Sequence, residues 1–316
     1  MDPRTSFPKT IDLATAAVID FPALLFFCGG YVGSVSSSKP ASVRDAVYRA
    51  FTIKYTDQSS RIFLAEQFKD WTQDNVYGEL FSFEKDLASL SSAIVIFLES
   101  AGSIAELGAF SQQEGVKQKL LIFLQTKHYK QDSFIKLGPI KYLEDSFDGS
   151  VRPYPWQVTD YSSGSTLDED SLSGSMDEIC DAIAEVLGAN RVQRKFDTEA
   201  ARDQMLLIRD VIAQLIGLKL HEIESCLRDM GVALEIRRLK QYLYVLKTLN
   251  LIDIVPRGKD RFYIAKDGRQ FIRYGTKDGS RFDGLRLQAE VAAYYQQHDI
   301  SRFKAIAPVL AKLEDS

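Results

Sequence analysis

Four short, mainly apolar runs divide the first half of the chain, and each ends in small or polar residues. They lie at residues 23–28, 61–66, 93–98 and 120–124. Continuous apolar runs of this length are typical of strands that are buried on both faces, as in parallel sheets. The pattern therefore predicts four strands of one parallel sheet.

Helical spacing separates these runs. Apolar residues recur every three or four positions in residues 40–51, 80–90 and 103–113, and residues 177–187 have the pattern of a further short helix. Strands that alternate with helices of this length form right-handed βαβ units. We predict an α/β fold with a doubly wound, Rossmann-like parallel sheet.

The pattern changes at residue 198. Four helices and one hairpin are predicted from there on, at residues 198–217, 220–230, 234–250, 252–264 (the hairpin) and 285–297. The hairpin turn, Pro-Arg-Gly-Lys-Asp, is basic. Three helices followed by a basic-tipped hairpin predict a mostly helical winged-helix domain.

Length and charge both indicate two domains. A chain of 316 residues is long for one compact core. Residues 1–190 carry 16 Lys and Arg against 26 Asp and Glu, whereas residues 191–316 carry 23 against 17. We place the boundary between these halves and predict a flexible acidic loop at residues 159–176, which are rich in Ser, Gly, Asp and Glu. The basic second half permits contact with nucleic acid.

Composition excludes several classes of protein. The three cysteines, Cys28, Cys180 and Cys226, are odd in number and form no C-x-x-C pair, which fits a reducing compartment better than a disulfide framework. No apolar run is long enough to cross a membrane and no segment resembles a signal peptide. The three histidines are scattered without metal-ligand spacing. We expect a cytoplasmic protein with no membrane contact and no bound metal.

The best candidate for chemistry is the stretch Glu-Ser-Ala-Gly-Ser-Ile-Ala-Glu-Leu-Gly-Ala-Phe at residues 99–110. It takes the chain from the third predicted strand through a small-residue turn into a helix. Such a turn can bind a phosphate or a sugar, because backbone N–H groups point outward at the start of a helix. A structural interpretation also fits, since Ser103 followed by Glu106 is a capping-box pattern.

The surroundings favour a functional site. Gly29 and Gly30 end the first predicted strand, Glu66 ends the second, and Glu99 and Glu106 flank the turn after the third. The carboxyl ends of parallel strands meet at one edge, where open α/β sheets bind ligands. The glycine pair alone could simply tighten a turn. No G-x-G-x-x-G, G-x-S-x-G or Walker motif is present, so a carboxylate is the best catalytic candidate, and carboxylates act on glycosidic bonds.

These residues resemble a known family. Cys28-Gly29-Gly30, Glu66, the stretch at residues 99–110 and Ser-Phe-Ile-x-x-Gly-Pro at residues 133–139 are similar to the nucleoside 2-deoxyribosyltransferase-like effectors of bacterial retron systems. The resemblance covers essentially the whole chain. It implies a deoxyribosyltransferase-like catalytic domain at residues 1–190 and a winged-helix-like domain at residues 191–316 that docks on nucleic acid or protein.

The resemblance also implies a function. The protein would be a toxic effector of antiphage defence that hydrolyses the N-glycosidic bond of NAD or a related nucleotide or nucleoside, without a cofactor. Its partners would be the retron reverse transcriptase and the RNA-linked single-stranded DNA (msDNA) with its msr RNA, in a homo-oligomer or a higher-order assembly. Ala101 stands where a proline is common in similar effectors, and residues that complete the site of true transferases from a neighbouring subunit are not matched, so hydrolysis is favoured over transfer.

By match to the family motif, Glu106 would be the catalytic carboxylate and Glu99 the second catalytic candidate. The expected substrate-binding residues come from the three strand ends: Cys28, Gly29, Gly30, Tyr31, Glu66, Ser100, Gly102 and Ser103.

The second half has basic residues on its third helix and at the hairpin tip. Those that could contact phosphates are Arg237, Arg238, Lys240, Lys247, Arg257, Lys259 and Arg261. A protein-docking module with a solvated charged face is the alternative interpretation. A second class of function also stays open, namely a nucleotide-sensing winged-helix transcriptional regulator without catalytic turnover.

Overall fold

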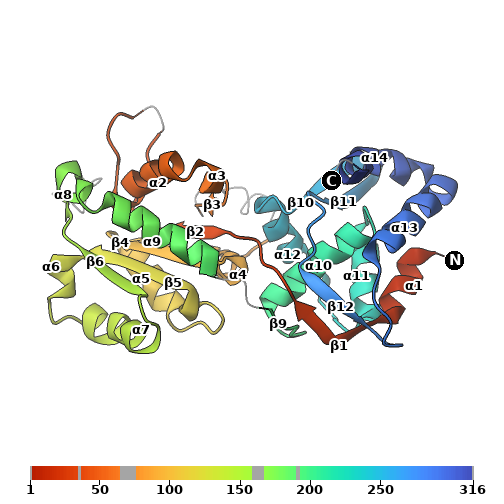
Figure 1. Ribbon diagram of the computed structural model, residues 1–316, viewed down its shortest axis with the longest axis horizontal. Helices are drawn as coiled ribbons and strands as arrows, with labels where there is room; N and C mark the ends of the chain where they lie inside the picture. The colour runs from red at the N-terminus through yellow and green to blue at the C-terminus, as the bar shows by residue number, and fades with distance from the viewer. Residues whose placement is uncertain (1, 35–36, 65–75, 159–166, 190–192, 315–316) are drawn as a thin grey trace. The chain divides into compact units, whose positions relative to one another are not determined.

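The computed structural model describes residues 2–34, 37–64, 76–158, 167–189 and 193–314 (Figure 1). The chain forms two compact units. The sheet unit comprises Pro22–Lys69 and Leu87–Asn190, and the helical unit comprises Met1–Phe21, Asp70–Asp86 and Arg191–Ser316. The predicted boundary after residue 190 is one of the points at which the chain passes between the units. The prediction did not account for the assignment of residues 1–21 and 70–86 to the helical unit.

The sheet unit is built on a five-stranded parallel sheet in the order β3-β2-β4-β5-β6. Its strands are β2 (Leu25–Cys28), β3 (Ile62–Phe63), β4 (Ala93–Leu98), β5 (Leu120–Gln125) and β6 (Val151–Tyr154). The predicted α/β class with a parallel sheet is confirmed. Because β2 pairs with β3 on one side and β4 on the other, the winding reverses between β2 and β4, and this is where open α/β sheets bind ligands.

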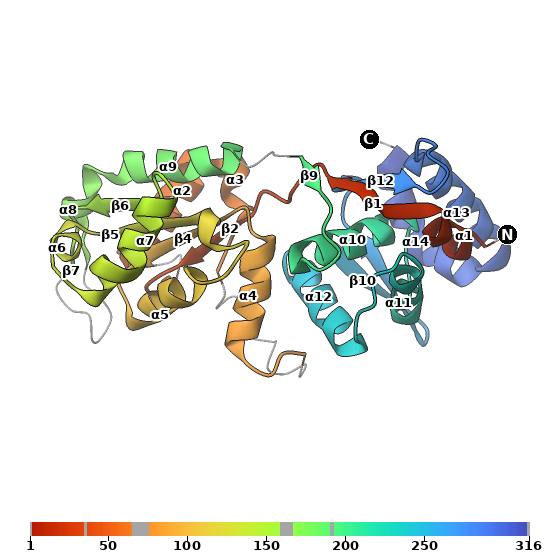
Figure 2. The ribbon, with the colours of Figure 1, turned by 90° about the horizontal axis from the view of Figure 1, so that it is seen from below.

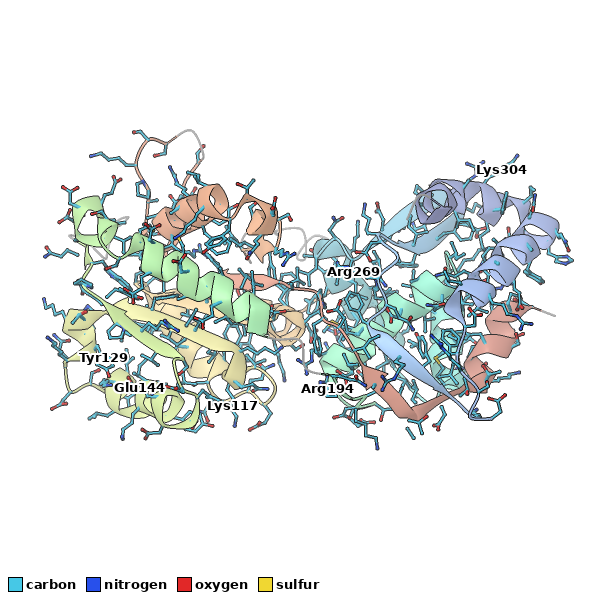
Figure 3. The ribbon with its side chains drawn as sticks, viewed as in Figure 1. Lys117, Tyr129, Glu144, Arg194, Arg269 and Lys304 are labelled. Carbon is cyan, nitrogen blue, oxygen red and sulfur yellow. The ribbon has the colours of Figure 1, made fainter. Side chains whose placement is uncertain are left out.

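Helices cover both faces of this sheet, with α2 and α9 on one face and α5 on the other (Figure 2). The helices of the unit are α2 (Val43–Lys54), α3 (Thr56–Ser59), α5 (Ala101–Phe110), α6 (Thr126–Tyr129), α7 (Lys141–Ser146), α8 (Glu169–Ser173) and α9 (Met176–Ala189). A 3-10 turn at Lys117–Lys119, a π-helical turn at Lys136–Ile140 and a hairpin of β7 (Gln157–Val158) and β8 (Leu167–Asp168) complete it. Tyr129 and Glu144 lie at the edge formed by α6 and α7 (Figure 3).

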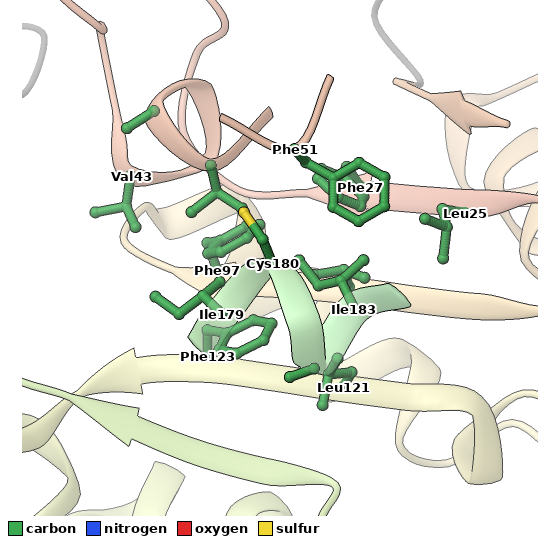
Figure 4. Close-up of a cluster of buried hydrophobic side chains, with 14 of the residues drawn as sticks. Leu25, Phe27, Val43, Phe51, Phe97, Leu121, Phe123, Ile179, Cys180 and Ile183 are labelled. Carbon is green, nitrogen blue, oxygen red and sulfur yellow. The ribbon is translucent and has the colours of Figure 1, made fainter. Parts of the chain in front are cut away.

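A row of phenylalanines packs across neighbouring strands in the core (Figure 4). The ring of Phe97 lies 5.9 Å from that of Phe27 and 5.2 Å from that of Phe123. Phe51 of α2 and Cys180 of α9 pack on the same cluster. Burial raises the pKa of the Cys180 thiol to about 11, so this cysteine serves as a packed apolar group.

The helical unit contains three successive helices followed by an antiparallel hairpin. Its helices are α1 (Pro3–Thr10), α10 (Ala201–Gln214), α11 (Leu220–Asp229), α12 (Ile236–Thr248), α13 (Gly284–His298) and α14 (Ile300–Glu314). Its strands are β1 (Ile11–Val18), β9 (Arg194–Lys195), β10 (Ile252–Arg257), β11 (Asp260–Ala265) and β12 (Ile272–Thr276). An isolated antiparallel bridge joins Leu218 to Tyr263 of β11. The remaining helix, α4 (Leu80–Leu90), passes through the division between the units.

The N-terminal segment is an integral part of the helical unit. Strand β1 is the middle strand of a three-stranded antiparallel sheet in the order β12-β1-β9. Glu222 of α11 accepts hydrogen bonds from Arg302 of α14 at 2.6 and 2.8 Å and from Arg4 of α1. This cluster of three charged residues joins α1, α11 and α14, and it lies inside the unit because Arg302 is only 1% exposed.

Most predicted elements are confirmed, and some with small shifts. The helix at residues 80–90 and the strand at residues 93–98 have the predicted bounds. The helix expected from residue 40 begins at Val43, because the hydroxyl of Ser42 caps it. The loop predicted at residues 159–176 is wrong for its described part, where residues from 167 onward form β8, α8 and the start of α9. None of the helices in the described parts of the chain is long and apolar enough to cross a membrane.

We expect that a fragment of residues 191–316 will not fold cooperatively on its own. It lacks β1, without which β9 and β12 lose their shared partner, and it lacks the Arg4 contact to Glu222. Thermal unfolding followed by circular dichroism, with the full chain as the control, tests this. A sharp transition of the fragment with dispersed amide NMR signals would contradict it.

Candidate active site at the carboxyl edge of the parallel sheet

The carboxylate of Glu99, directly after β4, organises this edge. Its Oε1 accepts hydrogen bonds from the backbone N–H groups of Gly30 and Arg44, both at 2.9 Å, and its Oε2 accepts from that of Val43 at 2.7 Å. The side chain is buried, with the residue 5% exposed. One carboxylate therefore joins the turn after β2, the end of β4 and the first turn of α2.

Burial raises the pKa of Glu99, although the three N–H groups and the Arg44 guanidinium act in the opposite direction. A carboxylate at the start of a helix also interacts favourably with the helix dipole. Because both oxygens are engaged by backbone donors and shielded from solvent, we assign Glu99 as a positioning residue rather than the group that reacts.

The glycine pair after β2 allows close packing around Glu99. A Cβ on Gly30 would lie 2.7 Å from the Cβ of Ser42 and 3.0 Å from the Cδ of Glu99. The structure thus supports the structural interpretation of this pair. The side chain of Cys28 is 1% exposed and packs inside the core, and its expected contact with substrate stays a prediction. Tyr31, by contrast, is 73% exposed just beyond the turn.

Helix α2 also holds the chain that follows the glycine turn. Asp45 accepts hydrogen bonds from the N–H groups of Gly33 at 3.1 Å and Ala41 at 2.8 Å. Arg49 pairs with Asp45 and donates to the carbonyl of Ser37 at 2.6 Å. Burial opposes ionisation of Asp45, but these hydrogen bonds outweigh it and hold the pKa of Asp45 below its usual range. Two side chains of α2 therefore hold the backbone of the segment that follows the glycine turn.

Two serines cap α5. The Oγ of Ser100 accepts from the N–H of Ser103 at 3.2 Å, and the Oγ of Ser103 accepts from the N–H of Ser100 at 3.1 Å. This is a capping box, but it does not include Glu106, because the helix begins at Ala101 rather than after Ser103. The predicted Ser103–Glu106 capping box is therefore wrong. Gly102 is exposed, and a Cβ there would meet only the Oγ of Ser100, at 3.8 Å.

Glu106 lies on the second turn of α5 and is half-buried. It shares one side of the helix with Phe110, four residues further on. The ring of Phe110 packs 6.1 Å from that of Phe26 in β2. Glu106 is therefore on the side of α5 that faces β2, at the point where the sheet reverses its winding. The remaining predicted carboxylate, Glu66, lies outside the described residues.

A cavity of about 480 Å³ opens on the other side of α5, at the carboxyl ends of β4 and β5. It is lined by Leu98, Glu99, Ser100, Ala101, Ile104, Leu124, His128, Gln131, Ser133, Ile135 and Lys136. Ligand pockets in proteins have this size and often lie at this edge of a sheet. Glu106 is not among the lining residues, so the cavity and the candidate catalytic carboxylate flank the same helix start. No group of three or more His, Cys, Asp and Glu in the described residues is arranged to hold a metal.

The seven basic residues predicted to contact nucleic acid differ in their surroundings. Arg238 forms two 2.7 Å hydrogen bonds with the buried carboxylate of Asp86, and its guanidinium lies 4.3 Å from the ring centre of Tyr242. Its guanidinium is therefore engaged within the helical unit while its side chain is 33% exposed, and its expected contact with phosphate stays a prediction. The others are exposed on α12 and at the hairpin: Arg237, Lys240, Lys247, Arg257, Lys259 and Arg261.

A segment of the helical unit also covers part of α12. The side-chain amide of Gln241 donates to the carbonyl of Val76 at 3.1 Å, and the hydroxyl of Tyr77 donates to the carbonyl of Gln241 at 3.3 Å. The rings of Tyr77 and Phe83 pack 6.2 and 5.7 Å from that of Tyr244. One side of this helix is therefore occupied by the chain itself.

Residues 40–254 match the protein family described as STM3845 retron effector protein, and this match covers more than half of the chain. The chain belongs to this retron effector family. The predicted resemblance to retron effectors is thus confirmed at the level of the family.

Two Escherichia coli proteins are similar to this retron effector. The one named "Retron Ec73 putative ribosyltransferase/DNA-binding protein" is 26% identical over 240 residues, which cover 67% of this chain and 73% of the relative. The one named "Retron Ec86 putative ribosyltransferase/DNA-binding protein" is 34% identical over 128 residues, which cover 40% of this chain and 39% of the relative.

Sequence reasoning missed several residues that shape this edge of the effector. Ser42 followed by Asp45 is itself a helix-capping pattern and could have marked the start of α2. The cavity walls at Ile104 and Leu124 carry no local signal. Ser133 and Ile135 lie in the stretch that contributed to the family resemblance, but no site role was predicted for them.

We expect Glu99→Gln to lower the free energy of unfolding by about 1–3 kcal/mol, the cost of leaving a buried donor unsatisfied. A glutamine carbonyl can still accept from Gly30 and Arg44, but its amide group would face the N–H of Val43. Chemical denaturation measures the difference, with the exposed Glu114→Gln as the matched control. Equal stability of the two variants would contradict the assignment.

Proposed function

We propose that this retron effector cleaves the N-glycosidic bond of a nucleotide or nucleoside, with Glu106 as its catalytic carboxylate. The observation that carries the proposal is the position of Glu106, half-buried on the second turn of α5 beside the edge where the sheet reverses its winding. Glu99, the other carboxylate that flanks the turn after β4, accepts hydrogen bonds from three backbone N–H groups and would position this edge. The word ribosyltransferase in the names of both relatives supports the same class of bond.

The reaction suits a carboxylate beside a helix start. As the bond between C1′ and the base nitrogen breaks, its electron pair leaves with the base and positive charge develops on the sugar. Glu106 stabilises that charge or attacks C1′. Water supplies the hydroxyl group that finally occupies C1′. The proton of that water goes to the base where the base leaves as an anion, and to solvent where, as with the nicotinamide of NAD, the base leaves as a neutral molecule. The substrate class is NAD or a related nucleotide or nucleoside, and no cofactor is required.

The two units support separate roles in this proposal. The sheet unit would be the deoxyribosyltransferase-like catalytic part. In the helical unit, α10 to α12, the bridge at Leu218 and the hairpin β10–β11 follow one another in the order of a winged helix. Its exposed basic residues would contact msDNA phosphates or the retron reverse transcriptase, which we propose as the partners that hold a toxic antiphage effector.

A sequence-reading transcriptional regulator is less well supported. A winged helix of that kind inserts its third helix into the major groove. In this chain the corresponding helix, α12, is covered on one side by Val76, Tyr77 and Phe83, and its Arg238 is paired with Asp86. Contacts between the remaining basic residues and the phosphate backbone of a nucleic acid need no such insertion.

We expect Glu106→Gln to reduce base release at least about 100-fold, the scale of losing one group that stabilises transition-state charge. The change keeps size and hydrogen bonding but removes the negative charge. Product analysis by liquid chromatography after incubation with NAD and a panel of nucleosides measures it, together with toxicity in cells that carry the reverse transcriptase and msDNA.

The matched control is Glu114→Gln, which removes an exposed carboxylate beyond the end of α5 and should leave both readouts unchanged. Base release by Glu106→Gln at the level of the control would refute the catalytic assignment. No product from the unaltered effector, free or released from its partners, would refute the enzyme class.

We expect the triple change of Arg257, Lys259 and Arg261 to alanine to weaken binding of msDNA and to reduce its salt dependence. Each lost phosphate contact lowers the slope of log K against log salt by about 0.7–0.9. The charge-matched control changes the exposed Lys277, Arg281 and Arg286. Identical salt slopes for the two triple variants would exclude the hairpin as the contact.

A further inference from the structure

The cavity beside α5 is separate from the side of that helix that bears Glu106. Ile104 lines the cavity, whereas Glu106 shares the opposite side with Phe110. The two sides meet at the start of α5, where the capping residue Ser100 and the first helical residue Ala101 both line the cavity. Helical side chains lean toward the N-terminus, so that of Glu106 is directed back over the turn that contains Gly102.

The residues that line the cavity are mainly apolar, with a few polar side chains among them. Leu98 and Leu124 come from the ends of β4 and β5, and Ile104 and Ile135 face the same space from α5 and the residues after α6. Gln131 and Ser133 add an amide and a hydroxyl to the lining. This combination suits a flat apolar ring that has hydrogen-bonding groups on its edge.

Charge in the cavity disfavours an anion. Lys136 is the one lysine among the lining residues, and its Nζ lies 2.7 Å from the carboxylate of Glu144 and 3.6 Å from the ring centre of Tyr129. Its charge is therefore already balanced. Glu99 adds a buried carboxylate to the lining. The lining therefore offers a phosphate group no lysine or arginine that is not already paired with a carboxylate, whereas a neutral ring needs none.

We propose that this cavity binds the nucleobase of the substrate, with the sugar crossing the first turn of α5 toward Glu106. The choice of a nucleobase rests on the proposed function. Ile104 and Leu124 would sandwich the ring, and Gln131 and Ser133 would read its edge. The glycosidic carbon then lies between a site that holds the base and a carboxylate on the neighbouring side of the helix.

The test uses the full chain carrying Glu106→Gln, so that no ligand is consumed. Binding of adenine, adenosine, 1-methylnicotinamide and inorganic pyrophosphate is measured by calorimetry. Ile104→Trp is added to fill the cavity from α5, and Ser133→Trp fills it from the opposite wall. Ala105→Trp, at an exposed neighbouring position, is the matched control. Thermal unfolding of each variant checks that it folds.

We expect at least one of the ring compounds to bind, both cavity-filling variants to weaken it at least about tenfold, and Ala105→Trp to leave it unchanged. Equal binding by Ile104→Trp and Ala105→Trp would overturn the proposal, as would binding of pyrophosphate in place of the rings. The outcome is independent of Glu106. If Glu106→Gln still releases base and Ile104→Trp has lost ring binding, the cavity remains the proposed site for the nucleobase. Glu106 is then rejected as the catalytic residue.

Discussion

The carboxylate of Glu99 and its three backbone N–H partners set the geometry of the candidate site. A buried carboxylate is costly unless polar groups replace its water, and here the donors come from the turn after β2 and the start of α2. The contact fixes the spacing of β2, β4 and α2 at the point where the sheet reverses its winding. It also explains the glycine at position 30, because a Cβ there would collide with Ser42. The same packing that stabilises this edge therefore holds the carboxylate of Glu99 inside it.

The sheet unit was largely predictable because its signals are local. Strands buried on both faces must be apolar throughout, and β4 has the predicted bounds for that reason. The start of α5 was placed too late because Ser100-x-x-Ser103 and Ser103-x-x-Glu106 overlap, and either pair can cap a helix. Because β4 ends at Leu98, α5 can begin at Ala101, and the pair Ser100 and Ser103 caps it. The role of Glu99 could not be read from the sequence, since its donors Val43 and Arg44 lie more than 50 residues away.

Contacts between residues that are far apart in the sequence limited the prediction of the helical unit even more. Its helices follow their apolar spacing, but the strand β1 that completes its sheet comes from the far end of the chain. Its burial does not alternate regularly, because the register with β12 shifts between Asp12 and Ala17, so the usual period of two is lost. Arg238 was predicted to contact phosphates because no local pattern could reveal its partner, Asp86, which lies about 150 residues earlier. A basic residue on a predicted DNA-reading helix is thus ambiguous until its partners are known.

The motif at residues 99–110 contains two glutamates that no sequence pattern distinguishes. In the folded protein they have different surroundings. Glu99 follows a strand directly, so its side chain enters the packed edge, where backbone donors surround it. Glu106 comes two helical turns later, half-buried on the side of α5 that faces β2. Two carboxylates in one short segment can take different roles when their environments differ in burial and hydrogen bonding. The first would hold the edge rigid and the second would act on what binds there. Under the proposed function, rigidity at Glu99 would be a condition for catalysis at Glu106, because a developing charge is stabilised only by groups that are already in position.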